Sequence, residues 1–368
     1  MVTFNKIKSI ILVDPMSYNN LSIYDKLLLL NLNIKEKWLI GNIKYEHKST
    51  SKFKIKLLYS YQNYNIKLYK LLSYLYSQIK LFIFVLKIKP NIIHFQWFKI
   101  PSFDLIILYL IKFTFKSRIQ IIFTAHNVLP HDTGNKFKKI YKKIYNIVDK
   151  IIVHESYARN KIINEFNISE DKIKVIPHGL LYEKNNKKEF YLKNNKKLVF
   201  SVLGNLNYYK GIDIVIDAWA NSNILKNNND ILLLIAGKPD KYIKQKLNTL
   251  NSYNNVKIID RFLEETEFIN CLLSTNVLLL PYREISQSGL LLTSLSFNIP
   301  IVVSKKGGLI EPFNFGKIGW ILNNNTSDEL KELLEGLVRV RNEIYKIHNN
   351  KKVWNSILKY YNWKNIAR

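Results

Sequence analysis

Short, uninterrupted apolar runs alternate with helical stretches along most of this chain. Runs rich in Ile, Val and Leu, without polar alternation, are typical of parallel strands that are buried on both faces. Alternation of such strands with helices predicts an α/β fold with doubly wound parallel sheets. The runs are Ser9–Val13, Trp38–Ile40, Ile92–Phe95, Ile119–Thr124, Lys150–Val153, Lys174–Ile176, Leu198–Leu203, Ile231–Ala236, Val256–Ile259, Val277–Leu280 and Ile299–Val303.

A polar stretch at 180–197, rich in lysine and asparagine, separates two groups of these runs. With 368 residues, the chain is long enough for two domains, each with its own core. We therefore predict two Rossmann-like domains, 1–185 and 196–352, that face each other across a cleft. The aromatic segment 353–368 is predicted to be one helix that docks back on the N-terminal domain.

The formal net charge is +28, and it is unevenly distributed. Residues 1–195 carry a net charge of +20 and the remainder +8. In residues 52–89 lysines are interleaved with aromatic and aliphatic residues, a pattern that fits an anionic bilayer surface. A solvated lysine-rich helix face is the alternative. Nucleic acid is not expected as a partner, because clustered arginines and a binding module are absent from the sequence.

Cysteine content and apolar run length bear on location. A single cysteine, Cys271, excludes an internal disulfide and fits a reducing compartment. The runs Leu81–Leu86 and Leu105–Ile111 are far shorter than the ~20 apolar residues of a membrane span. The N-terminus enters a strand at once and lacks a small-residue cleavage site. We expect a cytoplasmic protein, peripheral on the inner face of the cell membrane.

Several familiar catalytic devices are absent from the sequence. It has no Walker A motif, and Asp14-Pro15 follows the first strand where a G-x-G-x-x-G turn would begin. It also has no HExxH motif or Cys/His cluster, so we expect no metal and no cofactor beyond a co-substrate.

Polar and glycine-containing segments do follow several predicted strands. They are 124–131, 153–156, 176–179 and 203–211, together with the strand–turn–helix–strand segment Pro281–Pro312. Ligands of open α/β sheets bind at the carboxyl ends of strands, and a helix that begins there offers free N–H groups to a phosphate. A purely structural role for the strand-end histidines is the alternative.

These segments resemble those of retaining, nucleotide-sugar-dependent glycosyltransferases of the GT-B fold, of the group 1 or family 4 type. Bacterial members that build surface polysaccharides are the most similar. The resemblance extends from about residue 90 to the end. It rests on HFQW (94–97), TAHNVLPH (124–131), VDKIIVHES (148–156), KVIPHG (174–179), LGNLNYYKGID (203–213), LLLPYREISQSG (278–289), NIPIVVSKKGGLIE (298–311) and YNWKNIA (361–367).

The resemblance implies roles for individual residues. It places Lys210 on the donor diphosphate, His126 near the anomeric centre and Glu284 on the transferred sugar, and these three are the catalytic candidates. The donor-binding candidates are Gly204, Asn205, Asn207, Arg261, Arg283, Ser286, Gln287, Ser288, Gly289 and Thr293. The candidates for the acceptor side or the cleft are Asn127, His131, His154 and His178.

Two departures from the family pattern stand out. The second of two glutamates, which usually holds the nucleotide ribose, falls on Thr293, counting back from Pro300. The turn before Lys210 has Asn205 and Asn207 where many relatives carry an arginine, so we hypothesise that Arg283 compensates.

The sequence thus predicts a metal-independent retaining hexosyltransferase. It would move a sugar from a nucleotide-sugar donor to a lipid-linked or saccharide acceptor in surface polysaccharide synthesis. Two alternatives stay open. One is an inactive GT-B homologue that serves as a partner in a biosynthetic complex. The other is a basic membrane- or nucleic-acid-binding protein.

Overall fold

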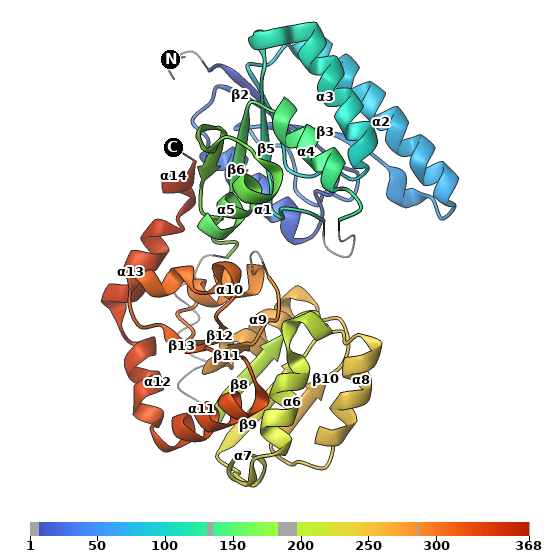
Figure 1. The fold of residues 1–368 in the computed structure, drawn as a ribbon. Coiled ribbons are helices and arrows are strands. Elements are labelled where there is room, and N and C mark those ends of the chain that lie inside the picture. The colour runs from blue at the N-terminus through green and yellow to red at the C-terminus, as the bar shows by residue number, and fades with distance from the viewer. Residues whose placement is uncertain (1–6, 131–134, 183–196, 286–287, 368) are drawn as a thin grey trace. The chain divides into compact units, whose positions relative to one another are not determined.

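The computed structural model describes residues 7–130, 135–182, 197–285 and 288–367 (Figure 1). The chain forms two compact units. Unit 1 comprises Met1–Leu181 together with Asn362–Arg368, and unit 2 comprises Tyr182–Tyr361. The predicted domain limits at 185 and 196 fall within 183–196, outside the described residues.

Unit 1 is built on a parallel sheet of seven strands in the order β3-β2-β1-β4-β5-β6-β7. Its first strand lies between the second and the fourth, so the chain winds outward in both directions from β1. The strands are β1 (Ser9–Val13), β2 (Glu36–Asn42), β3 (Lys54–Tyr59), β4 (Ile92–Phe95), β5 (Gln120–Thr124), β6 (Lys150–Val153) and β7 (Ile173–Val175).

Unit 2 repeats this topology with a parallel sheet of six strands, in the order β10-β9-β8-β11-β12-β13. The strands are β8 (Leu198–Leu203), β9 (Ile231–Ala236), β10 (Val256–Ile259), β11 (Val277–Leu280), β12 (Ile301–Ser304) and β13 (Gly319–Leu322). The predicted α/β class with two doubly wound parallel sheets is confirmed.

Two strands were not predicted, and both are outermost in their sheets. β3 exposes most of its side chains, so its sequence lacks the continuous apolar character of a central strand. β13 likewise contains two partly or fully exposed positions among its four residues. Seven predicted runs coincide with observed strands to the residue, from Ser9–Val13 to Val277–Leu280.

The helices of unit 1 are α1 (Asn20–Asn31), α2 (Lys67–Ile88), α3 (Pro101–Phe115), α4 (Lys138–Ile147), α5 (Ser156–Phe166) and α14 (Trp363–Ile366). Those of unit 2 are α6 (Ile212–Ala220), α7 (Asn223–Lys226), α8 (Lys241–Leu247), α9 (Glu265–Leu273), α10 (Gly289–Ser296), α11 (Ser327–Arg339), α12 (Arg341–His348) and α13 (Lys351–Tyr360). Each unit has its own apolar core, formed where helices cover its sheet.

Helix α2 corrects the expectation that no segment is long and apolar enough to span a bilayer. Its 22 residues include a window of mean hydropathy 1.5, so within the described ranges it passes that test by length and composition. Lysines interrupt the apolar sequence of α2, so it contains no uninterrupted apolar run of spanning length. One side of α2 is nevertheless buried in unit 1, including Tyr74, Leu81, Phe84 and Val85.

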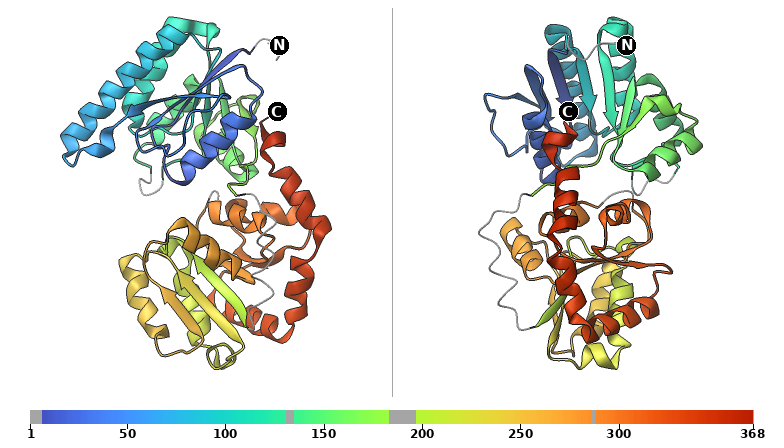
Figure 2. Two further views of the ribbon diagram at one scale, coloured as in Figure 1. Left: turned by 180° about the vertical axis from the view of Figure 1, so that it is seen from behind. Right: turned by 90° about the vertical axis from the view of Figure 1, so that its left-hand side faces the viewer.

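The terminal segment is two helices and not one, and the two belong to different units. α13 ends at Tyr360, and the Asn362 side chain accepts the Lys364 N–H at the start of α14. α13 packs against α10 in unit 2, whereas α14 packs against α1 in unit 1 (Figure 2). The break follows from this cap, because an N-cap residue has a non-helical backbone and begins a new helix.

Candidate functional site

In unit 2, the chain segments that follow β8 and β11 lie side by side, because these two strands are neighbours in the sheet. Gly204 ends β8 with a φ of +87°, a left-handed value that favours glycine. A Cβ on Gly204 would lie 3.7 Å from the Lys210 ammonium nitrogen. The glycine strand end and Lys210 therefore border the same space.

Gly211 fixes the position of this lysine. Its φ is +68°, and a Cβ added to it would lie 2.0 Å from the Pro281 carbonyl oxygen. Only glycine allows the two segments to approach this closely. A hydrogen bond of 2.8 Å from the Arg283 N–H to the Tyr209 carbonyl joins the segments again. The Lys210 turn is thus held against the start of Pro281–Pro312.

Burial lowers the pKa of Lys210 to about 8. Its ammonium lies 5.8 Å from the centre of the Tyr282 ring, and no salt bridge joins it to a carboxylate in the described part of the chain. A partly desolvated cation without a carboxylate partner is suited to an incoming anion.

Helix α10 begins at the end of the segment that follows β11, the same segment against which the Lys210 turn is held. The buried Ser288 is its N-cap and accepts the Leu291 N–H at 3.2 Å. Gly289 is exposed, and a Cβ placed on it would contact nothing within 4 Å. Its φ is also outside the left-handed range. The described protein itself therefore gives no reason for glycine at position 289.

Thr293 occupies the position where the family's ribose glutamate was expected. It is buried in α10, and its hydroxyl donates to the Gly289 carbonyl at 2.7 Å. The hydroxyl proton is thereby used inside the helix. The structure offers no carboxylate at this position.

Arg283 does not have the setting that we hypothesised for it. Its guanidinium makes a bidentate ion pair with Asp213, at 2.8 and 2.7 Å, and also donates to the Tyr208 carbonyl. It lies over the Tyr208 ring, 4.0 Å from the ring centre. Because Asp213 neutralises its charge, Arg283 braces the turn before Lys210 and does not replace a free diphosphate-binding arginine.

The other predicted donor residues have looser settings. Arg261 makes a bidentate ion pair with Glu267 on the surface, which likewise engages its charge. Glu284 and Asn205 are exposed, and Asn207 is half-buried. Ser286, Gln287 and His131 lie outside the described residues.

In unit 1, the strand-end histidines form one buried polar chain. His94 Nε2 is 2.7 Å from Thr124 Oγ1 and 3.3 Å from the Gln96 amide. The oxygen of the same amide, Gln96 Oε1, is 2.8 Å from His126 Nε2, and His126 Nδ1 is 3.1 Å from His154 Nε2. The ends of β4, β5 and β6 are connected in this way.

The hydrogen bond of His154 at one end of this network determines which ring nitrogens carry protons. His154 Nδ1 lies 2.9 Å from the Ile176 carbonyl, which only accepts, so this nitrogen carries a proton. In a neutral His154 ring, Nε2 then accepts the N–H of His126 Nδ1. A neutral His126 accepts at Nε2, which requires the Gln96 amide to turn its NH₂ group towards it. As placed, it is the Gln96 oxygen that faces His126 Nε2, and with that orientation either His126 or His154 must be an imidazolium.

Burial favours the neutral chain. It lowers the pKa of His154 to about 4 and that of His94 to about 3, and the pKa of His126 lies well below its ordinary value for the same reason. His178, whose Nδ1 lies 2.7 Å from the Gly179 carbonyl, also has its pKa lowered to about 3 by burial. These imidazoles are therefore uncharged at neutral pH.

Aromatic rings enclose the histidines. Trp97 stacks on His126 with ring centres 4.9 Å apart, and Tyr24 meets the same ring edge-on at 5.0 Å. Tyr24 also packs against His154, His178 and Trp363. The Trp97 indole N–H is buried and has no acceptor among the described residues. Asn127, next in the chain after His126, is half-buried.

A pair of buried carboxyls lies at the end of β1. Asp14 and Asp25 are within hydrogen-bonding reach of each other, and burial raises the pKa of Asp14 to about 7. The pKa of Asp25 is also raised well above its usual range, first by burial and then by the charge of Asp14. Burial and their proximity thus favour the protonated, uncharged form of both carboxyls.

Sequence reasoning did not identify several of these residues as functional. Asp14, His94 and Gln96 stand at or next to strand ends, so the rule that selected His126 would have found them. Tyr24 lies within α1, and its sequence position carries no such signal.

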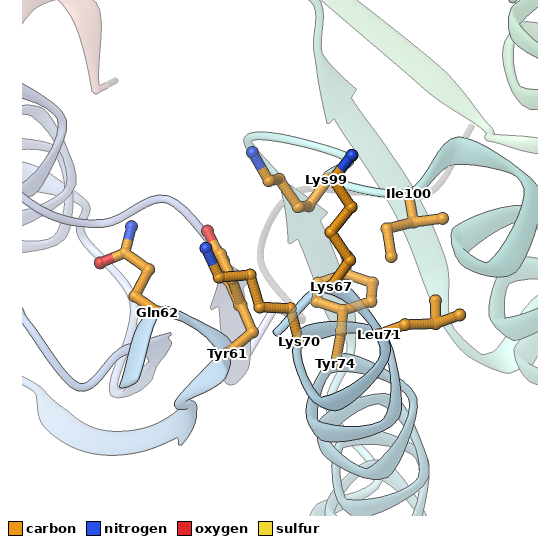
Figure 3. A pocket seen from close by; sticks show the side chains of 8 residues that line it. All are labelled: Tyr61, Gln62, Lys67, Lys70, Leu71, Tyr74, Lys99 and Ile100. Carbon is orange, nitrogen blue, oxygen red and sulfur yellow. The ribbon is translucent and has the colours of Figure 1, made fainter. Parts of the chain in front are cut away.

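A basic pocket of about 370 Å³ lies at the start of α2 (Figure 3). No acidic side chain lines it. No salt bridge engages its three lysines within the described residues. The lining residues are Tyr61, Gln62, Lys67, Lys70, Leu71, Tyr74, Lys99 and Ile100. The four histidines, the acid pair and this pocket all belong to unit 1.

Each of the two units matches a known protein family. Residues 183–354 match the family Glycosyl transferases group 1. Residues 46–181 match Glycosyltransferase Family 4. Each half of the chain thus matches a glycosyltransferase domain family. The matches meet at the boundary between the two units, so the comparisons support a group 1 glycosyltransferase.

Among curated proteins, this chain is similar to a probable sucrose-phosphate synthase of Thermosipho melanesiensis. The two are 21% identical over 224 residues, covering 58% of this chain and 50% of the relative. An uncharacterized glycosyltransferase of Methanocaldococcus jannaschii is 27% identical over 246 residues, covering 62% of this chain and 60% of the relative. The matched part of the chain spans only half to three fifths of these relatives.

Among solved structures, HepE of Anabaena in complex with UDP has a TM-score of 0.71 at 13% identity, covering 98% of this chain and 97% of HepE. At this identity the likeness concerns the fold. The chain thus has two parallel-sheet Rossmann-like domains of the GT-B type, as predicted.

Within the described residues, no group of three or more His, Cys, Asp or Glu side chains is arranged to hold a metal ion.

Proposed function

We propose that this protein transfers a sugar from a nucleotide-sugar donor to an acceptor, with retention of configuration and without a metal ion. The observation that carries the proposal is the lysine turn of unit 2. Lys210 is partly buried, lacks a carboxylate partner among the described residues, and is held by Gly211 against the segment that leads to α10. This turn lies within the match to glycosyl transferases of group 1.

In the proposed reaction, the bond between the anomeric carbon and the diphosphate oxygen breaks, and a bond forms from that carbon to an acceptor hydroxyl oxygen. The leaving diphosphate oxygen takes the bonding electron pair and develops negative charge, and the proton of the acceptor hydroxyl passes to that oxygen. Lys210 and the N–H groups at the start of α10 would stabilise this charge. Ser286 and Gln287 would lie on the same diphosphate, and Glu284 on the transferred sugar.

The donor that we propose to test first is a uridine diphosphate sugar. Its support is that HepE, which has the same fold, has been solved with UDP and with UDP-glucose. A hexose is the proposed transferred group. Because Thr293 replaces the usual ribose glutamate, we expect the ribose to be held by fewer contacts than in relatives that have it.

His126 remains the candidate for contact near the anomeric centre. Its neutral, hydrogen-bonded ring would serve as a fixed hydrogen-bonding group and not as a proton carrier, because both of its nitrogens have partners and its pKa is low. Asn127, His154 and His178 would line the acceptor side, together with His131.

A thermal-shift screen of the full chain against UDP, GDP, ADP and dTDP, and their sugars, tests the donor proposal. A ligand that binds only the folded state stabilises it by about 2.7 kcal/mol at 100 times its Kd. We expect one nucleotide to raise the Tm and Lys210→Ala to abolish that rise. Lys241→Ala, which removes an exposed lysine at the start of α8, should preserve it. A folded wild-type protein that responds to none of these ligands contradicts the proposal.

For the acceptor we propose a lipid-linked or saccharide molecule of surface polysaccharide synthesis, used by a cytoplasmic enzyme that is peripheral on the membrane. A second candidate is transfer to a sugar phosphate. It is favoured by the three lysines of the basic pocket and by the similarity to a probable sucrose-phosphate synthase. An acceptor panel with and without phosphate separates the two candidates. Lys99→Glu should raise the KM for a phosphate-bearing acceptor and leave the nucleotide thermal shift unchanged.

An inactive partner protein is a distinct outcome of the same experiments. It would bind a nucleotide in the thermal-shift screen and transfer no sugar to any acceptor. If transfer occurs, the anomeric signals of the product by NMR test retention, and undiminished activity in EDTA tests metal independence.

A further inference from the structure

Helix α2 has an exposed apolar stripe along its whole length. The stripe residues follow one another at intervals of three or four, so they lie on one side of the helix. Each is between 38% and 59% exposed. They are Leu68, Leu72, Tyr76, Ile79, Ile83 and Leu86.

Helix α3 extends this surface. It packs beside α2 in unit 1, as both views in Figure 2 show. Its exposed residues Ile106, Tyr109, Leu110 and Phe113 repeat the same spacing, and Phe113 is 84% exposed. Two adjacent helices thus each present an exposed apolar stripe, and we call the two stripes together the α2–α3 face. Contiguous apolar patches on a soluble unit are typically binding surfaces.

The opposite side of each helix is committed to the core of unit 1. In α2 this side includes Tyr74, Leu81 and Val85, and in α3 it includes Leu108 and Ile111, all of which are buried. The α2–α3 face therefore cannot turn inward without dismantling the core. Any partner of this face must therefore come from outside unit 1. Because the other side of α2 is buried in unit 1, α2 would lie in the plane of a membrane surface and would not span it.

The charge around the α2–α3 face is positive. Residues 52–116 contain eleven lysines and a single acidic residue, Asp104. Asp104 is buried and accepts hydrogen bonds from Tyr74 and Gln78, so it does not offset the lysines at the surface. On α2, the exposed Lys80 and Lys87 flank the stripe. The Lys80 ammonium lies 4.1 Å from the centre of the Tyr76 ring.

We propose that the α2–α3 face docks on the surface of an anionic lipid bilayer, with both helices in the plane of the interface. Apolar side chains would enter the boundary between headgroups and acyl chains, and lysines would reach lipid phosphates. A second copy of this chain fits less well, since two such faces would bring lysines together. Nucleic acid would leave the aliphatic stripe without a partner. The proposal does not depend on the transfer reaction.

Vesicle co-sedimentation of the full chain tests this docking. Binding is expected to vesicles of phosphatidylcholine with phosphatidylglycerol, to be weak with phosphatidylcholine alone, and to weaken as salt is raised. The double variant Lys80→Glu/Lys87→Glu should lose about tenfold or more in affinity. Its matched control is Lys241→Glu/Lys244→Glu on α8, which changes the net charge equally and should retain binding.

The apolar part of the docking surface is tested separately. Phe113→Ser should weaken binding about tenfold, while Phe262→Ser, which replaces a 66% exposed phenylalanine of unit 2, should not. Because these side chains are exposed, the variants should keep the wild-type Tm, and a Tm measurement verifies this.

Three results would overturn the proposal. The first is equal loss of binding in the variants and their controls, which would indicate non-specific charge attraction. The second is no binding to anionic vesicles by the folded wild-type protein. The third is a dimer, without vesicle binding, that Phe113→Ser converts to a monomer by light scattering. None of these requires nucleotide, so failure of docking and failure of donor binding can be told apart.

Discussion

Gly289 is a residue that the fold of unit 2 does not require. Its φ is outside the left-handed range, and a Cβ there meets no atom of the described residues within 4 Å. A glycine in open space at the start of α10 is explained if a ligand must approach the backbone closely. This makes Gly289 a sensitive probe of the donor site.

We predict that Gly289→Ala preserves or slightly raises the Tm but abolishes the nucleotide-induced thermal shift. Replacing glycine at a compatible helical position stabilises a protein by about 0.4–1 kcal/mol, whereas the added methyl would occupy ligand space. Gly336→Ala in α11, another site with no atom within 4 Å of the added Cβ, is the control and should keep the nucleotide shift. Unchanged nucleotide affinity in Gly289→Ala would place the ligand elsewhere.

Lys210 gives a pH-dependent prediction. Because burial lowers its pKa to about 8, its ammonium is charged at pH 7 and loses its proton as pH rises through 8. Binding a diphosphate above that pH must first take up a proton, so affinity should fall by up to about tenfold per pH unit between pH 8 and 9. Isothermal titration calorimetry from pH 7 to 9 measures this. Lys210→Arg should flatten the profile, because a guanidinium stays charged.

At the residue scale, the sequence predicts where a side chain lies in the fold better than it predicts which side chain it contacts. The position of Lys210 beside a glycine strand end followed from the strand-end rule and the resemblance. The engagement of Arg283 by Asp213 did not, because the two are 70 residues apart and meet only through the fold. The same holds for Tyr24, which reaches the histidines from the side of a helix.

At the scale of elements, β4, β5 and β6 share a network that should make unit 1 sensitive to acid. His94 and His154 have folded-state pKa values of about 3 and about 4, against about 6.5 in an unfolded chain, and burial also holds the pKa of His126 well below its ordinary value. Between these values the histidines bind more protons in the unfolded state, so their contribution to the free energy of unfolding falls as pH is lowered from about 6.5 towards 4. The buried Asp14, Asp25 and Asp104, whose pKa values are raised, contribute in the opposite direction.

We predict that His94→Gln reduces this acid sensitivity. The variant removes one group that must stay uncharged in the core, so its stability should decline less steeply than that of the wild type between pH 7 and 5. Urea unfolding at pH 8, 7, 6 and 5 measures the slopes. The comparison at pH 8 isolates the cost of altered packing, since the histidines are uncharged there in both states. Parallel profiles for the two proteins would show that His94 does not carry the effect.

Sequence predicted the elements best where burial is uniform. Central strands such as β8 and β9 are apolar except for the buried Ser201, so their limits could be read directly. Edge strand β3 is mostly exposed and resembles the basic helix that follows it. For α2, the lysine-interrupted pattern concealed both its 22-residue length and its exposed stripe.

At the scale of the whole molecule, the chain passes between the two units twice, after Leu181 and after Tyr361. The second passage delivers α14 to unit 1. There Trp363 donates from its indole nitrogen to the Leu180 carbonyl at 2.7 Å and packs edge-on against Tyr24. Gly179 makes room for it, because a Cβ there would lie 2.2 Å from the indole ring.

We predict that Trp363→Ala destabilises unit 1 and leaves unit 2 unchanged. Loss of a buried tryptophan costs about 3–5 kcal/mol, which lowers a Tm by about 10 °C for a unit of this size. Differential scanning calorimetry with and without UDP assigns the transitions, since nucleotide should raise only that of unit 2. Trp354→Ala, at a buried tryptophan of α13, is the converse control. A single transition that shifts as a whole in both variants would contradict independent unfolding of the units.

The return of α14 to unit 1 also has a consequence for protein synthesis. On the ribosome, residues 362–367 emerge after every residue of unit 2. Domains generally fold as units and in order of synthesis. Here, however, the unit that begins to emerge first cannot complete its packing until the other has been fully translated. Until then Tyr24 and Gly179 lack Trp363, so unit 1 is the part of the nascent chain that stays incomplete the longest.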